Sequence, residues 1–350
     1  MAKDIISIEK VLNSRCSSDL ETVSEKLHWG TMTDQLPPQS VIDQVFECCK
    51  VPRFSNGDLI QWWKDGYLYT GFKLVEGSDM ARLLNIESGM QQQAVYLACS
   101  AMGLGTCILN QGVNGTVYGE KIATGRHMLR VLSSNFEFRK FSEKAPGPQK
   151  PFVAGININV PLRDGNVECL PELPRLTTSN KMGRKVTEPD VSQLLWAAKG
   201  RTPHLIRLHK WKTMWGLTIP TWTGGQDYTS VYLVVADKLY RYVNWTKDFT
   251  LLGKLLGEKL KWTRGNPTHD IKLLRKINIS DQINGFEKAI ILSQNEKTCR
   301  ALWEVGYMLE NLFLQAKSLA ISYDSKIFTS QETLQLAHKG VPGSVAALLI

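Results

Sequence analysis

Two distant stretches of this chain carry the same pattern of a helix followed by a strand. The first begins at Gly89 with GMQQQAVYLACSAMGLGT, and the second begins at Gly306 with GYMLENLFLQAKSLAISY. They align without a gap, so that Leu97 meets Leu314. Apolar residues surround most of each helix, which predicts two largely buried helices that each run into a strand.

Two further pairs of segments repeat in the same order. IDQVFECCK, residues 42–50, resembles VSQLLWAAK, residues 191–199, and both predict helices that bury one face. KDGYLY at 64–69 and ADKLYRY at 236–242 are both typical of a strand that leaves a tight turn. Three matches in one order favour an internal duplication.

The duplication predicts both the fold and the division of the chain. We expect an α+β protein built from two tandem α/β units that pack together as an intramolecular pseudo-dimer. The expected parts are an N-terminal extension, a first half, a linker and a second half, at residues 1–27, 28–160, 161–185 and 186–350. The linker is predicted from its prolines and polar residues.

The composition is that of a globular protein, with 43% hydrophobic and 21% charged residues in a chain of 350. The N-terminus lacks a continuous apolar core of the signal-peptide type, and no apolar run reaches the length of a membrane-spanning helix. We therefore expect a cytoplasmic protein with no membrane partner. The seven cysteines are odd in number and show no C-x-x-C spacing, so we expect reduced structural thiols, including Cys48 and Cys49 in the core, and no metal site.

Positive charge gathers in one part of the chain. Residues 199–276 hold 15 Lys/Arg against 5 Asp/Glu, a net charge of +10 in a chain whose total is +9. Such a segment is either a solvated basic face or a surface that attracts an anion, such as a phosphorylated cofactor or an acidic peptide. Binding of RNA would rest on charge alone, because no recognised nucleic-acid motif accompanies it.

Several of these motifs together resemble the nitroreductase-like flavoprotein superfamily, and in particular its SagB-type dehydrogenase branch, which includes azoline oxidases of peptide biosynthesis. VSQLLWAAKG at 191–200 is similar to the first helix of that branch, and SVYLVVADKLYRY at 230–242 to the strand and hairpin that follow it. GMQQQAVYLACSAMGLGT resembles the central helix of the superfamily and the glycines at its flavin edge. The resemblance implies an FMN fold that usually works as a homodimer, with flavin at the interface, but here with both copies on one chain.

The resemblance also implies where the flavin ring would lie. Its N5 and O4 edge needs backbone N–H donors that approach closely, which requires small side chains. Gly103, Leu104, Gly105 and Thr106 would provide that edge in the first half. The alternative is a glycine that ends a helix, followed by ordinary packing. In the second half Ala320 and Ser322 replace the glycines.

Other parts of the implied flavin site are divided between the halves. Lys181 and Arg184 would contact the FMN phosphate, although they could instead belong to a basic linker. The first half has no Lys or Arg between His28 and Gln44 that could play the same part. The loops over the ring would come from the opposite half, and each could instead be an ordinary turn. Their candidate residues are Ser55, Asn56 and Gly57 in the first half and Thr221, Gly224 and Tyr228 in the second, with Tyr228 also a candidate for a catalytic proton donor.

Two functions remain open from the sequence. The first is an FMN-dependent oxidoreductase that transfers hydride through flavin N5 to or from a small aromatic, nitro, quinone or peptide-azoline substrate, with NAD(P)H as a possible reductant. The second is a catalytically degenerate relative that sequesters flavin or serves as a scaffold subunit of a peptide-modifying complex. The half with the better phosphate cations has the poorer ring edge, so we expect two unequal sites.

Overall fold

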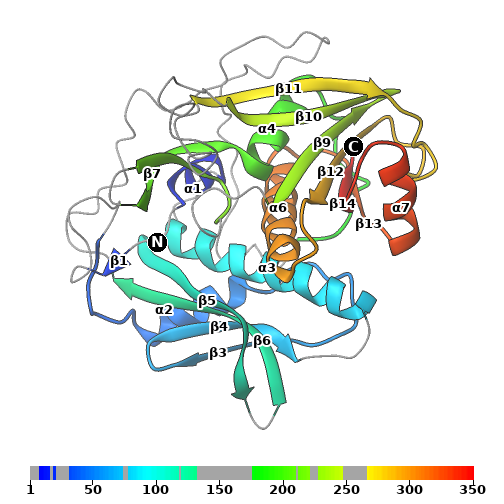
Figure 1. Cartoon of the computed structure of the whole chain (residues 1–350). Coiled ribbons are helices and arrows are strands. Elements are labelled where there is room, and N and C mark those ends of the chain that lie inside the picture. Colours follow the sequence, from blue (N-terminus) through cyan, green and yellow to red (C-terminus); the bar gives the residue numbers. More distant parts are fainter. Residues whose placement is uncertain are drawn as a thin grey trace.

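The computed structural model places two long helices between two antiparallel sheets (Figure 1). It describes residues 8–15, 19–20, 31–73, 78–117, 120–131, 176–209, 212–220, 228–246 and 266–350. Within these ranges no helix combines the length and apolar character needed to cross a lipid bilayer.

The smaller sheet is built by the first half of the chain in the strand order β3-β4-β6-β5. Its strands are β3 (Leu59–Lys64), β4 (Tyr67–Lys73), β5 (Leu104–Val117) and β6 (Glu120–Val131). Helix α2 (Gln39–Cys48) precedes them, and the long helix α3 (Ser78–Ala101) lies between β4 and β5. Asp65 and Gly66, with φ of 52° and 79°, form the left-handed two-residue turn that suits a β3–β4 hairpin.

The larger sheet is built by the second half in the order β11-β10-β9-β12-β14-β13. Its strands are β9 (Thr229–Val235), β10 (Lys238–Thr246), β11 (Asn266–Lys276), β12 (Lys288–Gln294), β13 (Asp324–Ile327) and β14 (Ser344–Leu349). Its helices are α4 (Glu188–Lys199), α6 (Cys299–Ser318) and α7 (Ser330–His338). The short elements α1 (Ile8–Ser14), β1 (Asp19–Leu20), β2 (Thr31–Met32), β7 (Arg201–His209) and β8 (Lys212–Leu217) lie outside both sheets.

The two sheets share one strand order once β10 and β11 are set aside. The order β9-β12-β14-β13 of the larger sheet then matches the order β3-β4-β6-β5 of the smaller sheet, position by position. Every pair of neighbouring strands is antiparallel in both sheets. Strands β4 and β12 each come before the long helix of their half. The predicted tight turns at the start of KDGYLY and ADKLYRY are both present, with Ala236 at φ 50° in the second. However, β4 occupies an inner position of its sheet while β10 lies outside β9, so β10 and β11 are an addition to the larger sheet.

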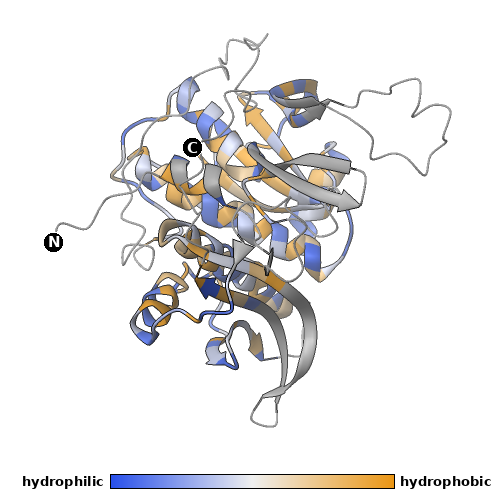
Figure 2. Ribbon diagram, turned by 90° about the vertical axis from the view of Figure 1, so that its left-hand side faces the viewer, coloured by the Kyte–Doolittle hydropathy of each residue, from blue (hydrophilic) through white to orange (hydrophobic). Residues whose placement is uncertain are grey.

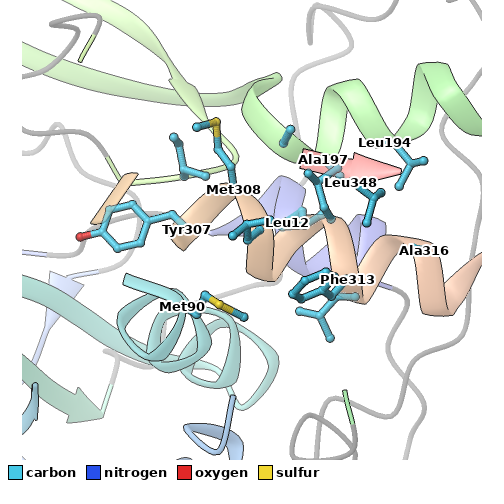
Figure 3. Close-up of a cluster of buried hydrophobic side chains, with 14 of the residues drawn as sticks. Leu12, Met90, Leu194, Ala197, Tyr307, Met308, Phe313, Ala316 and Leu348 are labelled. Carbon is cyan, nitrogen blue, oxygen red and sulfur yellow. The ribbon is translucent and has the colours of Figure 1, made fainter. Parts of the chain in front are cut away.

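The core lies around α6, between the two sheets. Leu12 of α1, Leu194 of α4, Phe313 of α6 and Leu348 of β14 have no exposed surface and gather there (Figure 3). Hydrophobic residues also dominate the central elements in the hydropathy view (Figure 2). Cys48 and Cys49 belong to this core, as their position on a helix predicted. The segment predicted as an N-terminal extension thus contributes α1 to the core.

Helices α3 and α6 cross at two glycines. A Cβ atom on Gly306 would lie 2.1 Å from the carbonyl oxygen of Ile86, and one on Gly89 would lie 2.3 Å from that of Trp303. The contact is reciprocal, because the alignment that pairs Gly89 with Gly306 also pairs Ile86 with Trp303. The backbones of the two helices therefore touch at this point, and only glycine allows the approach.

Candidate functional site

The edge predicted to hold the flavin ring begins where α3 ends. Gly103 has φ 69°, the left-handed conformation with which helices often end, and β5 starts at the next residue. Strand β5 is the last strand of its sheet, so one of its sides has no strand partner in the described part of that sheet. In this half, Gly103 ends the helix and the strand that follows it has an open side, so the two features occur together.

The direction of the N–H groups along β5 follows from its pairing with β6. Opposed residues of an antiparallel ladder alternate between exchanging two hydrogen bonds and exchanging none. Leu104 faces Val131, whose N–H and C=O are already bonded to Gln35 and Thr33, so Leu104 directs its N–H away from β6. Two and four residues further along, Thr106 and Ile108 point the same way, and the Ile108 N–H donates to the Tyr96 hydroxyl at 3.0 Å.

Thr106 adds a buried hydroxyl to this edge. Its side chain is 2% exposed, and its Oγ1 has no hydrogen-bond partner among the described residues. Gly105, between Leu104 and Thr106, is also buried and leaves no side chain over the strand. We refer to Leu104, Gly105 and Thr106 as the open edge. A buried polar atom without a partner costs free energy, which a bound ligand could recover.

Second-half residues are held close to the open edge by a buried arginine. The Arg15 guanidinium donates to the carbonyl oxygens of Leu217 and Ile219 at 2.6 and 3.1 Å. It lies 5.3 Å from the ring centre of Tyr96, whose hydroxyl reaches β5. Arg15 therefore links α1, the open-edge side of α3 and the segment that leads into the predicted second-half loop, a link that the sequence did not reveal.

A second contact fixes the same segment from the side of the helices. The Gln93 amide on α3 donates to the Thr218 carbonyl at 3.0 Å and to Asn311 Oδ1 on α6 at 2.7 Å. Thr221 and Gly224 lie outside the described residues. Tyr228 is 6% exposed, and its carbonyl accepts from the Asn295 N–H at 2.7 Å.

The corresponding edge of the second half is closed. Ala320, which aligns with Gly103, takes the same left-handed conformation with φ 51°. The next three N–H groups are all used: those of Ile321, Ser322 and Tyr323 donate to the carbonyl oxygens of Ala316, Arg184 and Asn180 at 3.2, 2.8 and 2.8 Å.

The segment that closes this edge, which contains Asn180 and Arg184, belongs to the predicted linker. Residues 161–175 of that linker lie outside the described part of the chain. A Cβ atom on Gly183 would lie 2.1 Å from the Ile321 carbonyl carbon, so this segment packs directly against the edge. The donors that a flavin ring would need here are taken by the chain itself. A flavin edge does not fit the second half.

Arg184 is committed to an ion pair rather than directed to an open site. Its guanidinium binds both carboxylate oxygens of Asp190, at 2.6 and 2.8 Å. Asp190 also accepts from the N–H and the hydroxyl of Thr187, closing the capping box of α4. Burial alone would raise the pKa of Asp190, but the bonds from Arg184 and Thr187 outweigh it and lower that pKa to about 2. Lys181 is exposed beside this segment.

The first-half loop is held by a carboxylate that sequence reasoning missed. Glu87 of α3 has no exposed surface, and its oxygens accept from Arg53 Nε at 2.9 Å, the Phe54 and Ser55 N–H groups at 2.5 and 2.6 Å, and the Ser55 hydroxyl at 2.8 Å. We call this set of bonds the Glu87 latch. It holds Ser55 and Gly57 half-buried and leaves Asn56 exposed.

The latch also places this loop against the second half. The Phe54 ring lies 6.4 Å from that of Phe313, which stacks on Tyr323 at 5.7 Å. The structure therefore brings Ser55–Gly57 towards the closed edge rather than the open one. The predicted flavin residues fall into two groups at opposite edges.

Glu304 is the counterpart of Glu87 in the aligned second half. It has no exposed surface and accepts from the Thr229 hydroxyl at 2.9 Å, while the Lys199 ammonium donates to the Thr229 carbonyl at 2.6 Å. Glu87 thus anchors the chain shortly before β3, and Glu304 anchors the first residue of β9, so each carboxylate holds the chain near the start of the first strand of its sheet. The sequence pattern that could have revealed this pair is Glu-x-Gly, which ends at the first glycine of each aligned helical stretch.

Glu310 of α6 is a buried acid whose two oxygens have no hydrogen-bond partner among the described residues. Burial raises its pKa well above the usual value, so the folded chain keeps a proton that the unfolded chain releases. Stability should therefore fall as pH rises above the unfolded pKa of about 4.3. We expect Glu310→Gln to match the wild type at pH 4 and to exceed it by about 1–3 kcal/mol at pH 8. Urea denaturation at both pH values measures the difference, and a difference independent of pH would contradict this account.

No group of three or more His, Cys, Asp or Glu side chains suited to a metal ion occurs in the described ranges. The described cysteines are free thiols, with Cys99 buried beside the open-edge end of α3. Burial raises the pKa of Cys99 to about 12, against an opposing effect of the nearby Thr106 hydroxyl, and keeps it a neutral thiol. A thiol is only a weak hydrogen-bonding group, so its proximity does not satisfy that hydroxyl. The buried thiols of Cys48, Cys49 and Cys99 therefore serve as small apolar side chains.

Comparisons with known proteins bear on the fold. No protein-family model matches the sequence, and no curated protein matches it. A solved structure from Anabaena variabilis, described as a "putative nitroreductase", aligns over 98% of this chain and 99% of its own, with a TM-score of 0.52 and 9% identity. One from Thermotoga maritima with the same description aligns over 100% and 96%, with a TM-score of 0.40 and 11% identity. The near-complete match to the Anabaena protein shows that this chain has a nitroreductase-like fold.

Proposed function

We propose that the chain is an FMN-dependent oxidoreductase and that it holds FMN at the open edge of β5. The observation that carries the proposal is the unpartnered Thr106 hydroxyl beside the outward N–H groups of Leu104 and Thr106. Together they give three donors at one strand edge, where Leu104 is half-buried and Thr106 is buried, next to a glycine with no side chain to obstruct a flat ring. The nitroreductase-like fold supports an oxidoreductase of this kind.

The proposal includes an origin by duplication, with the two halves packed as a pseudo-dimer. Three kinds of observation support it: the shared strand order, the reciprocal glycine contact, and Glu87 and Glu304 in the same relative positions. An isologous contact pairs each residue with the counterpart of its partner, as Gly89–Trp303 and Gly306–Ile86 do. The division at residues 28–160 and 186–350 and the SagB-type affinity belong to this proposal.

FMN, when bound, supplies hydride transfer at its N5 atom. The chain's own residues would orient it: the Leu104 and Thr106 N–H groups and the Thr106 hydroxyl as donors, and Arg15 as the residue that keeps the second-half segment in place. The substrate class that we propose is a small aromatic, nitro, quinone or peptide-azoline compound, with NAD(P)H as a candidate reductant. Tyr228 stays a candidate proton donor.

Thr106→Val tests the site, because valine keeps the shape of threonine and removes only the hydroxyl. We expect the apoprotein to gain about 1 kcal/mol of stability, since an unpartnered buried hydroxyl disappears. We expect FMN affinity to fall about tenfold, the loss of one hydrogen bond to the ligand. Thermal denaturation and FMN fluorescence quenching measure the two effects.

Thr70→Val is the control, since Thr70 is as buried as Thr106 but lies on β4, where its hydroxyl contacts His127 Nε2 at 3.5 Å. It should leave FMN affinity unchanged. The site assignment is wrong if Thr106→Val binds FMN as well as the wild type does.

A second function is favoured by the closed edge and by the engagement of Arg184 with Asp190. Both remove parts of the implied flavin site, as expected of a degenerate relative that sequesters flavin or acts as a scaffold. The visible spectrum separates the readings. An oxidoreductase should bind one FMN per chain and lose its flavin absorbance with NAD(P)H. Bound flavin that NAD(P)H does not reduce supports sequestration, and a chain that takes up no FMN supports a scaffold.

A further inference from the structure

A cavity lies between the halves, away from the open edge. It has a volume of about 290 Å³ and is lined by Phe54, Asp79, Arg82, Leu83, Ile327, Phe328 and Thr329. These residues come from the latched loop, the beginning of α3 and the junction of β13 with α7, near the α3 end below α7 in Figure 1. None belongs to β5, so the cavity is separate from the proposed flavin site.

Most of its wall is apolar and held in place. Phe54 is fixed through its backbone N–H, which donates to Glu87 at 2.5 Å. Phe328 has no exposed surface, so it supports the cavity from within the core and offers a ligand no accessible face. Leu83 and Ile327, both partly buried, complete the apolar part. The cavity is therefore formed before any ligand arrives, which lowers the entropic cost of binding.

Its one described lining cation is Arg82, which is half-buried. The guanidinium donates to the carbonyl oxygens of Phe328 and, at 3.4 Å, of Ser344. Hydrogen bonds to carbonyl oxygens orient a guanidinium but do not neutralise its positive charge. Burial lowers the pKa of Arg82, and the charge of Asp79 opposes that change. Asp79 itself is exposed. Nearby Glu332 is already paired, with Lys326 at 2.7 Å, so it does not offset Arg82.

We propose that this cavity binds a small monocyclic aromatic carboxylate, with its ring against the apolar wall and its carboxylate on Arg82. The volume lies at the lower end of small-molecule sites, enough for one substituted ring and too little for FMN. A guanidinium has five N–H donors in a planar fork, so Arg82 can keep its carbonyl bonds and still receive a carboxylate. The proposal does not depend on flavin binding.

The experiment titrates the full chain with benzoate, benzamide and benzylamine by ligand-observed NMR. Benzoate should bind saturably with a Kd on the order of 1 mM, as expected for a ligand of its size. Benzamide, which has the same shape without the charge, should bind at least about tenfold more weakly, and benzylamine should not bind. Failure of benzoate to saturate, or equal binding of benzylamine, overturns the proposal.

Two variants locate the binding. Arg82→Met should weaken benzoate binding about tenfold or more, because one charge-assisted pair is lost. Leu83→Trp should abolish binding by filling the cavity, and it tests the same claim if Arg82→Met does not fold. Arg275→Met, at an exposed arginine of β11, and Thr106→Val should both bind benzoate like the wild type. Unchanged binding in Leu83→Trp, or loss of benzoate binding in Thr106→Val, would show that the ligand lies elsewhere.

Discussion

Gly306→Ala should strongly destabilise the folded chain. The new methyl group would lie 2.1 Å from the Ile86 carbonyl oxygen and 2.8 Å from the Gly89 Cα, and all of these are backbone atoms of a packed helix. Relief requires α3 and α6 to move apart, which opens the core that both helices line. Overpacking a core usually costs about 1–3 kcal/mol, and we expect about 3 kcal/mol or more because no side chain can yield. Urea denaturation followed by circular dichroism gives the loss.

Two further glycine variants test whether the close helix crossing causes this loss. Gly89→Ala should be nearly as damaging, since its Cβ would lie 2.3 Å from the Trp303 carbonyl oxygen. Gly285→Ala is the control: Gly285 has φ 75° and nothing within 4 Å of the added Cβ, so only the left-handed conformation is penalised, by about 1–2 kcal/mol. If Gly306→Ala is no less stable than Gly285→Ala, the close crossing is wrong.

The sequence pattern was sufficient for elements whose signals are local. The aligned stretches at Gly89 and Gly306 predicted two buried helices that run into strands, and α3 and α6 are such helices. The same alignment, extended towards the N-terminus, already contained Glu87 and Glu304. It could not reveal that the glycines face each other, because a helical glycine can equally reflect a tolerated position or a close contact.

Contacts between distant segments were beyond the sequence. The predicted linker was expected to connect the halves, yet Asn180 and Arg184 accept N–H groups from the strand region after α6. Pairing of this kind depends on backbone position, to which side-chain type contributes little. Arg184 was assigned to phosphate because cations favour anions, but a nearer anion existed on the following helix, at Asp190. The Thr187–Asp190 capping signal was local and pointed to that structural role.

The burial of Arg15 could not be predicted for the same reason, because it depends on contacts between distant segments. Arg15 lies in the part predicted as an extension, and its burial among second-half carbonyl oxygens follows from the packing of α1 on α3 and α6. Long side chains such as arginine are rarely buried unless paired, so composition alone would place it at the surface. The two edges differ for a related reason: Ala320 supports the same helix end as Gly103, and the neighbouring segment decides whether the edge stays open.

Glu87→Gln should cost about 3 kcal/mol of stability and release the loop at residues 53–57. The carboxylate accepts four bonds from Arg53, Phe54 and Ser55 in a site without exposed surface. An amide can accept at only one of its two heavy atoms, so N–H groups that now meet an oxygen would face an NH₂ group. Breaking a buried ionic network in this way costs about 3–5 kcal/mol when one partner is removed outright, and the amide should stand at the lower end.

Trypsin provides a local readout, because Arg53 lies inside the loop. The variant should be cut after Arg53 well before global unfolding, whereas the wild type should resist at the same temperature. Glu47→Gln is the control, since Glu47 is 52% exposed and pairs with exposed Lys50; it should change stability by less than about 0.5 kcal/mol. Benzoate binding gives an independent check, because Phe54 forms a wall of the cavity only while its N–H is held. A Glu87→Gln protein with wild-type stability, trypsin resistance and benzoate affinity would mean that the latch does not organise this loop.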